Sequence, residues 1–372
     1  MDFSFSGDQD EIRALAVRIL GDLSTPERLR EVEASEDRVD RKLWGELASA
    51  GLLGLALPEA VGGAGLGFVE TCILVEEAGR SAASIPLVAT LVLGAGPIND
   101  LGTPEQHQRW LPAVAEGRTI LTAALVETGG DPWTPSTTAV REGGGWRLDG
   151  TKSNVPAGMV ADAVVVPART PDGIGLFIVS ADAPGLGRQR QETTSGQDEA
   201  EIELDGVIVA TEGVLVAGPD GVEALAGLVD RAIAAVCVQE AGACQAAVKL
   251  TATYTSQREQ FDKVIATFQA VGQRAADAYI DTEAVRLTAW QAAWRLAEGL
   301  PAAEAVAIAK FWADEGAQRV VHACVHLHGG VGVDRDYPLH RYYLLTKQLA
   351  LTLGGGTQSL LHLGDLLATE PV

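Results

Sequence analysis

The chain changes texture twice along its length, and this order constrains the fold more than any single motif. Residues 1–118 and 223–372 space their apolar side chains as amphipathic helices do, with helices expected at 223–256, 267–298, 302–327 and 338–352. Between them lie short Val- and Ile-rich runs such as ADAVVVPAR and IGLFIVS, separated by Gly, Asp and Pro. The sequence predicts an α+β protein with an N-terminal helical domain (1–118), a central antiparallel β domain (119–222) and a C-terminal four-helix bundle (223–372).

Charge and apolar runs exclude several classes of function. Fifty acidic residues against 28 basic ones give a net charge of −22, which argues against binding nucleic acid or an anionic membrane surface. Glycines or charges interrupt the longest apolar runs, so no membrane-spanning helix is expected. Acidic residues stand where a signal peptide needs bases, and the four cysteines lack CxxC spacing. We expect a cytoplasmic protein with buried, reduced thiols.

The segment HACVHLHGG contains histidines that could bind a metal and glycines that could cap a helix or approach a ligand. His322 and His326 lie one helical turn apart, but no acidic or cysteine partner shares their face, so no metal site is predicted. The glycines that follow either cap a helix or let backbone amides approach a phosphate or an adenine closely. No GxGxxG pattern occurs anywhere, so a Rossmann dinucleotide site has no support.

A second segment, YTSQREQFDKVIATFQAVGQRAAD (254–277), joins two expected helices. Arg258 ends the first, and Phe261, Phe268 and Gln269 precede the second. The segment is either a helix–turn–helix with aromatic plugs or an arginine fork placed for a pyrophosphate.

Together with LWGELASAGLLGLALPEAVGGAGLG, EEAGR, LGTPEQHQRWLPAVAEG and HLHGGVGVDRDYPLHRYYLLTKQ, this segment resembles the signatures of the acyl-CoA dehydrogenase family, in the family's order and over essentially the whole chain. The resemblance implies the same helix–sheet–helix order, FAD as cofactor and an acyl-CoA thioester as substrate, with an electron-transfer flavoprotein as the usual acceptor. In the family a carboxylate removes the α-proton while the flavin takes the β-hydride. That proton is weakly acidic, so the chemistry needs a desolvated base.

Both positions where the family carries this base lack a carboxylate here. The family commonly shows Tyr-Glu-Gly-Thr near the C-terminus, and alignment on the Gly-Thr places the Glu on Gly355. The second family position, on the first helix of the C-terminal domain, falls on Ala232. Asp230 and Glu240 are the fallback candidates, but neither is in helical register with that position. We therefore predict no catalytic residue in this chain.

The residues that pack around the flavin ring in the family also differ. The family's Thr-Glu-Pro-x-x-Gly-Ser-Asp stretch reads VETGGDPW at 126–133. Its Trp-Ile-Thr segment reads SNVP, so Asn154 replaces the tryptophan and Pro156 the threonine. Asparagine offers no large stacking face, and proline has neither a hydroxyl nor an N–H. The resemblance therefore implies an eroded isoalloxazine pocket.

The residues that one family subunit extends to its neighbour's FAD are kept. The Arg-x-x-Phe and His/Gln-x-x-Gly-Gly segments reach the pyrophosphate and adenosine of that FAD in the family. The implied cofactor-binding residues here are Arg258, Phe261, Phe268, Gln269, His326, His328, Gly329, Gly330 and Thr357. This pattern is similar to the base-less subunit of actinobacterial α2β2 acyl-CoA dehydrogenases that act on steroid side chains, and it implies a catalytic paralogue as partner.

Two other hypotheses remain open at this point. The chain could be a self-sufficient homo-oligomeric dehydrogenase with Asp230 or Glu240 as a displaced base. It could also be a pseudoenzyme that holds an acyl-CoA without redox chemistry.

Overall fold

The computed structural model describes residues 4–369, which divide into two compact units. One unit combines the N-terminal helix with the C-terminal helices and contains residues up to 29, 72–83 and from 233 onward. The other holds residues 30–71 and 84–232 and includes the sheet.

The helices and strands follow the order helix, sheet, helix along the chain. The helices are α1 (Gly7–Leu23), α2 (Pro26–Glu33), α3 (Arg41–Ser49), α4 (Phe68–Arg80), η3 (Val88–Ala95, a π-helix), α5 (Gly96–Leu101), α6 (Pro104–Ala115), α7 (Asp220–Gln257), α8 (Gln269–Ala297), α9 (Ala303–His328), α10 (Leu339–Leu349) and α11 (Gly356–Thr369). The short 3-10 turns are η1 (Leu52–Gly54), η2 (Glu59–Val61), η4 (Thr211–Gly213), η5 (Ile265–Thr267) and η6 (Gly329–Val333). The strands are β1 (Leu121–Ala123), β2 (Thr138–Glu142), β3 (Gly145–Pro156), β4 (Ala163–Thr170), β5 (Gly173–Ser180), β6 (Leu186–Gln191), β7 (Glu199–Val209), β8 (Val214–Gly218), β9 (Glu259–Gln260) and β10 (Lys263–Val264).

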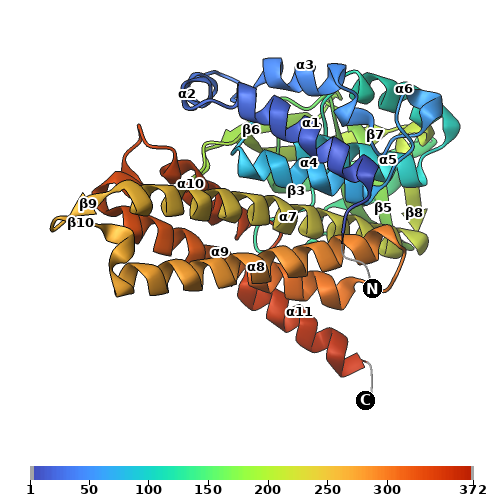
Figure 1. Ribbon diagram of the computed structural model, residues 1–372. Helices are drawn as coiled ribbons and strands as arrows, with labels where there is room; N and C mark the ends of the chain where they lie inside the picture. Colours follow the sequence, from blue (N-terminus) through green and yellow to red (C-terminus); the bar gives the residue numbers. More distant parts are fainter. Residues whose placement is uncertain (1–3, 370–372) are drawn as a thin grey trace. The chain divides into compact units, whose positions relative to one another are not determined.

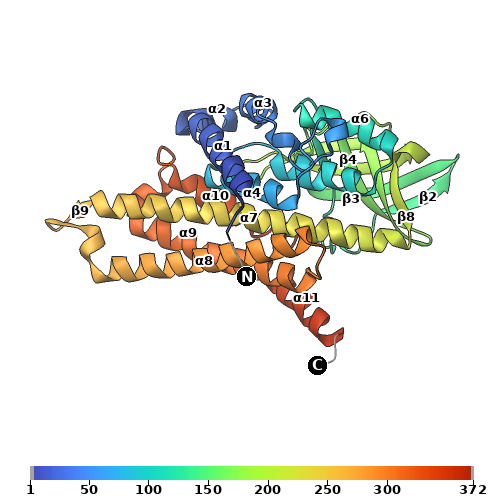
Figure 2. The ribbon, with the colours of Figure 1, turned by 45° about the vertical axis from the view of Figure 1, so that its right-hand side comes forward.

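Long antiparallel helices build the helical unit. Helices α7, α8 and α9 run side by side, with the β9–β10 hairpin at the end of α7 (Figures 1 and 2). Glycines let α4 approach α7 closely, because a Cβ at Gly79 would collide with the Gln239 carbonyl and one at Gly242 with the Glu76 carbonyl. Helix α11 packs on α9. The four C-terminal helices expected from apolar spacing are present, each starting and ending within three residues of the expected bounds.

The sheet unit is built on one mixed sheet with the order β6-β7-β3-β2-β4-β5-β8. Its inward side chains form a core cluster that includes Trp146, Phe177 and Ile202. The sheet was expected to be antiparallel, but β4 pairs in parallel with both β1 and β2. The reason is that β1 enters from the helical region and β2 follows a long loop, so neither reaches β4 through a tight hairpin.

Other differences concern elements with weak sequence signals. Strand β1 is three residues long, β6 contains four polar residues among six, and α11 lies beyond the helices expected from apolar spacing. Within residues 4–369, no helix combines the length and the hydropathy that crossing a bilayer requires.

Candidate functional site

Arg258 and Phe261 lie on the hairpin that links α7 to α8. The backbone N–H of Arg258 donates to the Tyr254 carbonyl and so ends α7. Phe261 and Asp262 form the two-residue turn, with φ of 55° and 59°, a conformation that β-hairpin turns use but that a bulky residue adopts at a cost. The Phe261 side chain is 87% exposed. Within the described residues the exposed Arg258 guanidinium has no ion-pair partner, so both side chains are free to meet another molecule.

The two other predicted residues of this segment stand at the start of α8. Phe268 is the N-cap and half-buried, and its ring meets that of Phe261 edge to face with centroids 6.4 Å apart. Gln269 is the first residue of α8 and is exposed. The structure therefore places the four residues of this segment on one exposed corner.

The glycines at the end of α9 differ in whether the fold requires a glycine at their positions. Gly329 has φ 61° and ψ −140°, a conformation that only glycine adopts without strain. Gly332 packs against Val325, whose carbonyl would lie 2.9 Å from an added Cβ. Gly330 has neither constraint, since its φ is ordinary and an added Cβ would meet nothing within 4 Å. The chain's own fold therefore does not require a glycine at 330.

The two histidines of this segment differ in their surroundings. His326 is exposed in the last turn of α9. His328 is buried and stacks on Tyr254, with ring centroids 4.3 Å apart. Its Nδ1 lies 2.7 Å from the Cys324 carbonyl oxygen and its Nε2 lies 3.1 Å from the Tyr337 hydroxyl. Burial lowers the pKa of His328. Sequence reasoning missed Tyr254 and Tyr337, although Tyr254 stands one helical turn before Arg258.

Two glycines of LGGGT, Gly354 and Gly355, lie in the linker between α10 and α11, and the third, Gly356, is the first residue of α11. Gly354 has φ 105° and follows Leu353, itself at φ 61°. Gly356 begins α11 against Asp314 and Glu315 of α9. At Gly355 the φ is ordinary and an added Cβ would meet nothing within 4 Å. A side chain would fit at 355, so packing does not explain why the carboxylate is absent.

Thr357 is exposed in the first turn of α11 and lies apart from the other predicted cofactor residues. Its neighbour Gly356 packs near Asp314, which precedes His328 by 14 residues on α9. At 1.5 Å per helical residue, the separation along α9 is about 20 Å. Within one chain the predicted residues therefore form two patches: the corner at the end of α7 and α9, and Thr357 near the middle of α9.

The fallback carboxylates both lie on α7 but in different surroundings. Ala232 is fully buried, and Asp230 is half-buried. Burial raises the pKa of Asp230 to about 6. Glu240 is 0% exposed, and burial raises its pKa well above the usual range.

Glu240 faces a buried ion pair on α9. Lys310 Nζ lies 2.6 Å from Asp314 Oδ1 and also donates to the carbonyls of Leu349 and Ala350, at 2.8 and 3.3 Å. These bonds cap the C-terminus of α10, where carbonyls have no intrahelical donor. Neither oxygen of Glu240 has a hydrogen-bond partner among the described residues. Its complete burial keeps Glu240 from contact with a substrate.

In the sheet unit, the residues at the family's flavin-ring positions are bonded within the sheet. Asn154 has φ 50°, its backbone N–H donates to Gln191 Oε1 at 2.7 Å and its side-chain amide donates to Glu199 Oε2 at 3.1 Å. The carbonyl of Pro156 accepts from the Thr122 hydroxyl at 2.6 Å. These residues supply no stacking face and do not fit a flavin ring.

A buried ion pair nearby holds the 126–133 segment to β3. Glu127 accepts from Lys152 Nζ at 2.6 Å and from the backbone and hydroxyl groups of Ser136 and Thr137. Desolvation opposes the charge, but the Lys152 ammonium and these hydrogen bonds lower the pKa of Glu127 to about 2. Glu127 therefore anchors the 126–133 segment to β3 through Lys152.

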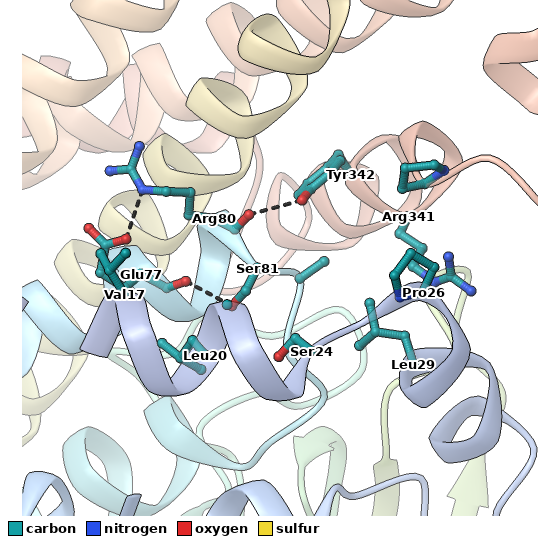
Figure 3. Close-up of a pocket in the computed structure, with 13 residues that line it drawn as sticks. Val17, Leu20, Ser24, Pro26, Leu29, Glu77, Arg80, Ser81, Arg341 and Tyr342 are labelled. Atoms are coloured by element: carbon teal, nitrogen blue, oxygen red, sulfur yellow. Dashed lines mark hydrogen bonds and ion pairs between the residues drawn. The ribbon is translucent and has the colours of Figure 1, made fainter. Parts of the chain in front are cut away.

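A cavity of ≈ 360 Å³ lies between α1, α2, α4 and α10 (Figure 3). Three hydrogen bonds join polar groups of its lining: Arg80 Nε donates to Glu77 Oε2, the Ser81 hydroxyl to the Glu77 carbonyl, and the Tyr342 hydroxyl to the Arg80 carbonyl, each at 2.9 Å. The buried Ser24 hydroxyl has no hydrogen-bond partner among the described residues. No predicted cofactor residue lines it. We therefore assign it no ligand.

No cluster of three potential metal ligands occurs among the residues that the structure describes. His322 instead lies 2.9 Å from Lys347 Nζ through its Nε2. The four cysteines are buried, and none forms a disulfide within residues 4–369. Burial raises the pKa of the Cys324 thiol to about 11, which makes this thiol a poor nucleophile.

Family models define the class of protein. Models of the N-terminal, middle and C-terminal domains of acyl-CoA dehydrogenases match residues 6–118, 126–207 and 220–363. The chain belongs to the acyl-CoA dehydrogenase family of FAD-dependent oxidoreductases. The family and the helix–sheet–helix fold class expected from the sequence are thereby confirmed.

Particular relatives are similar along the whole chain. The acyl-CoA dehydrogenase FadE27 of Mycobacterium tuberculosis is 40% identical, with 100% of both chains covered. The solved ChsE4-ChsE5 complex of the same organism contains a chain that is 40% identical, with a TM-score of 0.94 and 100% of both chains covered. A chain of a Tcur3481-Tcur3483 steroid ACAD variant is 48% identical, with a TM-score of 0.91 over 97% of this chain and 98% of that one.

Proposed function

We propose that the chain is the non-catalytic but obligatory subunit of a heteromeric, FAD-dependent acyl-CoA dehydrogenase. The observation that carries this proposal is Gly355, where the family's base would stand and the structure leaves open space but no carboxylate. Ala232, at the alternative base position, is buried and apolar. The reacting base therefore belongs to a catalytic paralogue in an α2β2 heterotetramer.

The fit to FAD differs between the two parts of the molecule. The corner with Arg258, Phe261 and Gly330 suits the adenosine and pyrophosphate end of a cofactor held by the partner. It offers an exposed cation without an ion-pair partner among the described residues, an exposed aromatic ring and a glycine that the fold does not need. Asn154 and Pro156 do not suit a flavin ring. When bound, the flavin supplies the acceptor for the hydride that leaves the β-carbon.

Exposed apolar residues supply a surface for the partner. Large apolar side chains project from α8 and α11, and a stable partner interface needs such a surface. They are Tyr279, Ile280, Leu287 and Trp294 on α8 and Leu360, Leu361 and Leu367 on α11.

The similar structures guide the choice of substrate and acceptor. One belongs to the Tcur3481-Tcur3483 steroid ACAD, and another comes from a structure of the electron transferring flavoprotein of Acidaminococcus fermentans, 30% identical with a TM-score of 0.91. We propose a bulky steroid side-chain acyl-CoA as substrate and an electron-transfer flavoprotein as acceptor, in the cytoplasm.

The test is to express the chain alone and together with an acyl-CoA dehydrogenase paralogue from the same genome. Flavin absorbance and native mass are recorded for each purified species. We expect a colourless lone chain and a yellow complex with one FAD per heterodimer. One FAD per chain in the lone protein would contradict the proposal. Arg258→Gln in the complex should weaken FAD binding, whereas Arg274→Gln, an exposed arginine on α8, should not.

A self-sufficient homo-oligomeric dehydrogenase is the second candidate function. Asp230 favours it, because burial raises the pKa of its carboxyl to about 6, which suits a general base. Under that hypothesis Asp230→Asn abolishes the turnover of the lone chain. The matched control is Glu240→Gln, which changes a carboxyl that no substrate can reach.

A further inference from the structure

The ring of His328 joins the two segments that form the corner patch. It stacks on Tyr254, which stands one helical turn before Arg258 and accepts the Arg258 backbone N–H. It is also the last residue of α9, directly before Gly329 and Gly330. A third contact, through Nε2, ties it to Tyr337 in the loop after η6. We call Tyr254, His328 and Tyr337 the aromatic stack.

The hydrogen bonds of His328 fix its tautomer. A carbonyl oxygen can only accept, so Nδ1 must carry the proton that bonds to Cys324. In the neutral ring Nε2 is then an acceptor and receives the Tyr337 hydroxyl. The ring is thus held by one donated bond, one accepted bond and one stacked face, an arrangement that leaves it a single orientation.

On the basis of the proposed donation to a partner's FAD, we infer that His328 is a positioning residue: through the aromatic stack it holds Arg258 and the Gly329–Gly330 turn in the one arrangement that receives the adenosine diphosphate part of the cofactor. The sequence assigned His328 to the cofactor-binding residues, but its ring is buried and both of its nitrogens are bonded within the chain, so we place its effect on FAD in the residues that it holds. Preorganisation of this kind raises affinity because binding need not order the two segments.

The test uses the complex with the catalytic paralogue and measures FAD affinity. His328→Phe keeps a ring against Tyr254 but loses both hydrogen bonds, and Tyr337→Phe removes one hydroxyl. We expect the FAD Kd to rise by about tenfold for Tyr337→Phe and further for His328→Phe, since one hydrogen bond is worth about a factor of ten. At saturating FAD, kcat should return to within about twofold of wild type, because neither residue touches the reacting atoms.

A matched control separates positioning from a general loss of packing. Tyr342→Phe also removes a phenolic hydroxyl with one bond, to the Arg80 carbonyl, but Tyr342 lies on α10 outside the aromatic stack. Its FAD Kd should equal that of wild type. An equal rise in Kd for Tyr342→Phe and Tyr337→Phe would overturn the inference, as would wild-type affinity in His328→Phe.

The pH profile gives an independent readout. The groups that face His328 are Tyr254 from α7, Tyr337 from the loop and Cys324 on its own helix, and none is a carboxylate or a cation. Because burial lowers the pKa of His328 below the usual 6.5, the wild-type FAD Kd should rise at acidic pH as Nε2 gains a proton. His328→Phe should lack this rise in Kd at low pH. An identical rise in the FAD Kd at acidic pH in both proteins would overturn the inference. A wild-type complex that holds no FAD at any pH would instead contradict the proposed function.

Discussion

Lys152 Nζ lies 2.6 Å from Glu127 Oε1 at a place where the lysine side chain is 0% exposed. A charge in such surroundings is stable only while its partner is present. The pair joins the loop after β1 to strand β3, so the sheet depends on it.

Replacing Lys152 by methionine should destabilise the protein strongly. The Glu127 carboxylate would stay buried without its counter-ion, which costs about 3–5 kcal/mol in the free energy of unfolding. Urea denaturation at pH 7 measures this. Glu203→Gln, at an exposed position on β7, is the control and should change stability by less than about 0.5 kcal/mol. Equal midpoints for Lys152→Met and Glu203→Gln would contradict the prediction.

Glu127 also predicts how the protein responds to acid. Its pKa is about 2 in the folded chain against 4.5 in the reference state. The stability it contributes is therefore present above about pH 4.5 and is lost as the pH falls towards 2, by about 3 kcal/mol at most. Glu127→Gln should remove this part of the acid slope. The check is a series of urea midpoints from pH 7 down to pH 2.5, and an unchanged slope in the variant would exclude this role.

Asp230 should change the pH dependence of stability in the opposite direction to Glu127. Because burial raises its pKa from 3.8 to about 6, the unfolded chain releases the proton first and stability falls as pH rises from about 4 to 6. Asp230→Asn should thus gain up to about 3 kcal/mol at pH 8 and nothing at pH 3.5. Asp277→Asn, at an exposed site on α8, should gain nothing at either pH. A gain of equal size at both values would refute the assignment.

Lys310, which bonds the carbonyls at the C-terminus of α10, gives a prediction that a second substitution at Asp314 can test. Lys310→Met leaves Asp314 without its counter-ion and the Leu349 and Ala350 carbonyls without a donor, at a cost of about 3–5 kcal/mol. Adding Asp314→Leu removes the unpaired charge and should recover part of that loss. Thermal melts of the single and double variants measure the coupling. Strict additivity of the two changes would show that the residues do not act as a pair.

Glycines at 355 and 79 should respond very differently to a side chain. Gly355→Glu meets open space and should shift Tm by no more than about 2 °C. Gly79→Ala places a methyl group against the Gln239 carbonyl and should destabilise the α4–α7 contact by about 2 kcal/mol or more. Differential scanning calorimetry compares the two. A large loss from Gly355→Glu would mean that the linker does not tolerate a side chain.

Local patterns made much of the fold predictable. The Ala- and Leu-rich period of α7, α8 and α9 is long enough to identify each helix, and the Val-rich runs identify β4 and β5. The parallel partners of β4 could not be predicted, because pairing between distant strands leaves no mark in either strand's own sequence. Strand β6 is polar since it lies at the sheet edge, where apolar alternation is not needed.

Site residues were predictable where a motif carried them. Arg258 and Gly330 stand in recognisable segments, and the structure shows them exposed. The roles of Tyr254, Tyr337 and Lys310 could not be found in this way, because each depends on contact with a residue far along the chain. Glu240 illustrates the converse: its sequence position made it a candidate base, and only its complete burial argues against contact with substrate.

Gly355 differs from the sheet residues in how easily a substitution could be accommodated. A single nucleotide change in a glycine codon can give glutamate, and the open space at position 355 sets no barrier to that side chain. Asn154 and Pro156 are different, because their bonds to Gln191, Glu199 and Thr122 have become part of the sheet. Under the proposed function, a carboxylate at position 355 alone would therefore not restore a flavin pocket, because the sheet residues at 154 and 156 would still supply no stacking face.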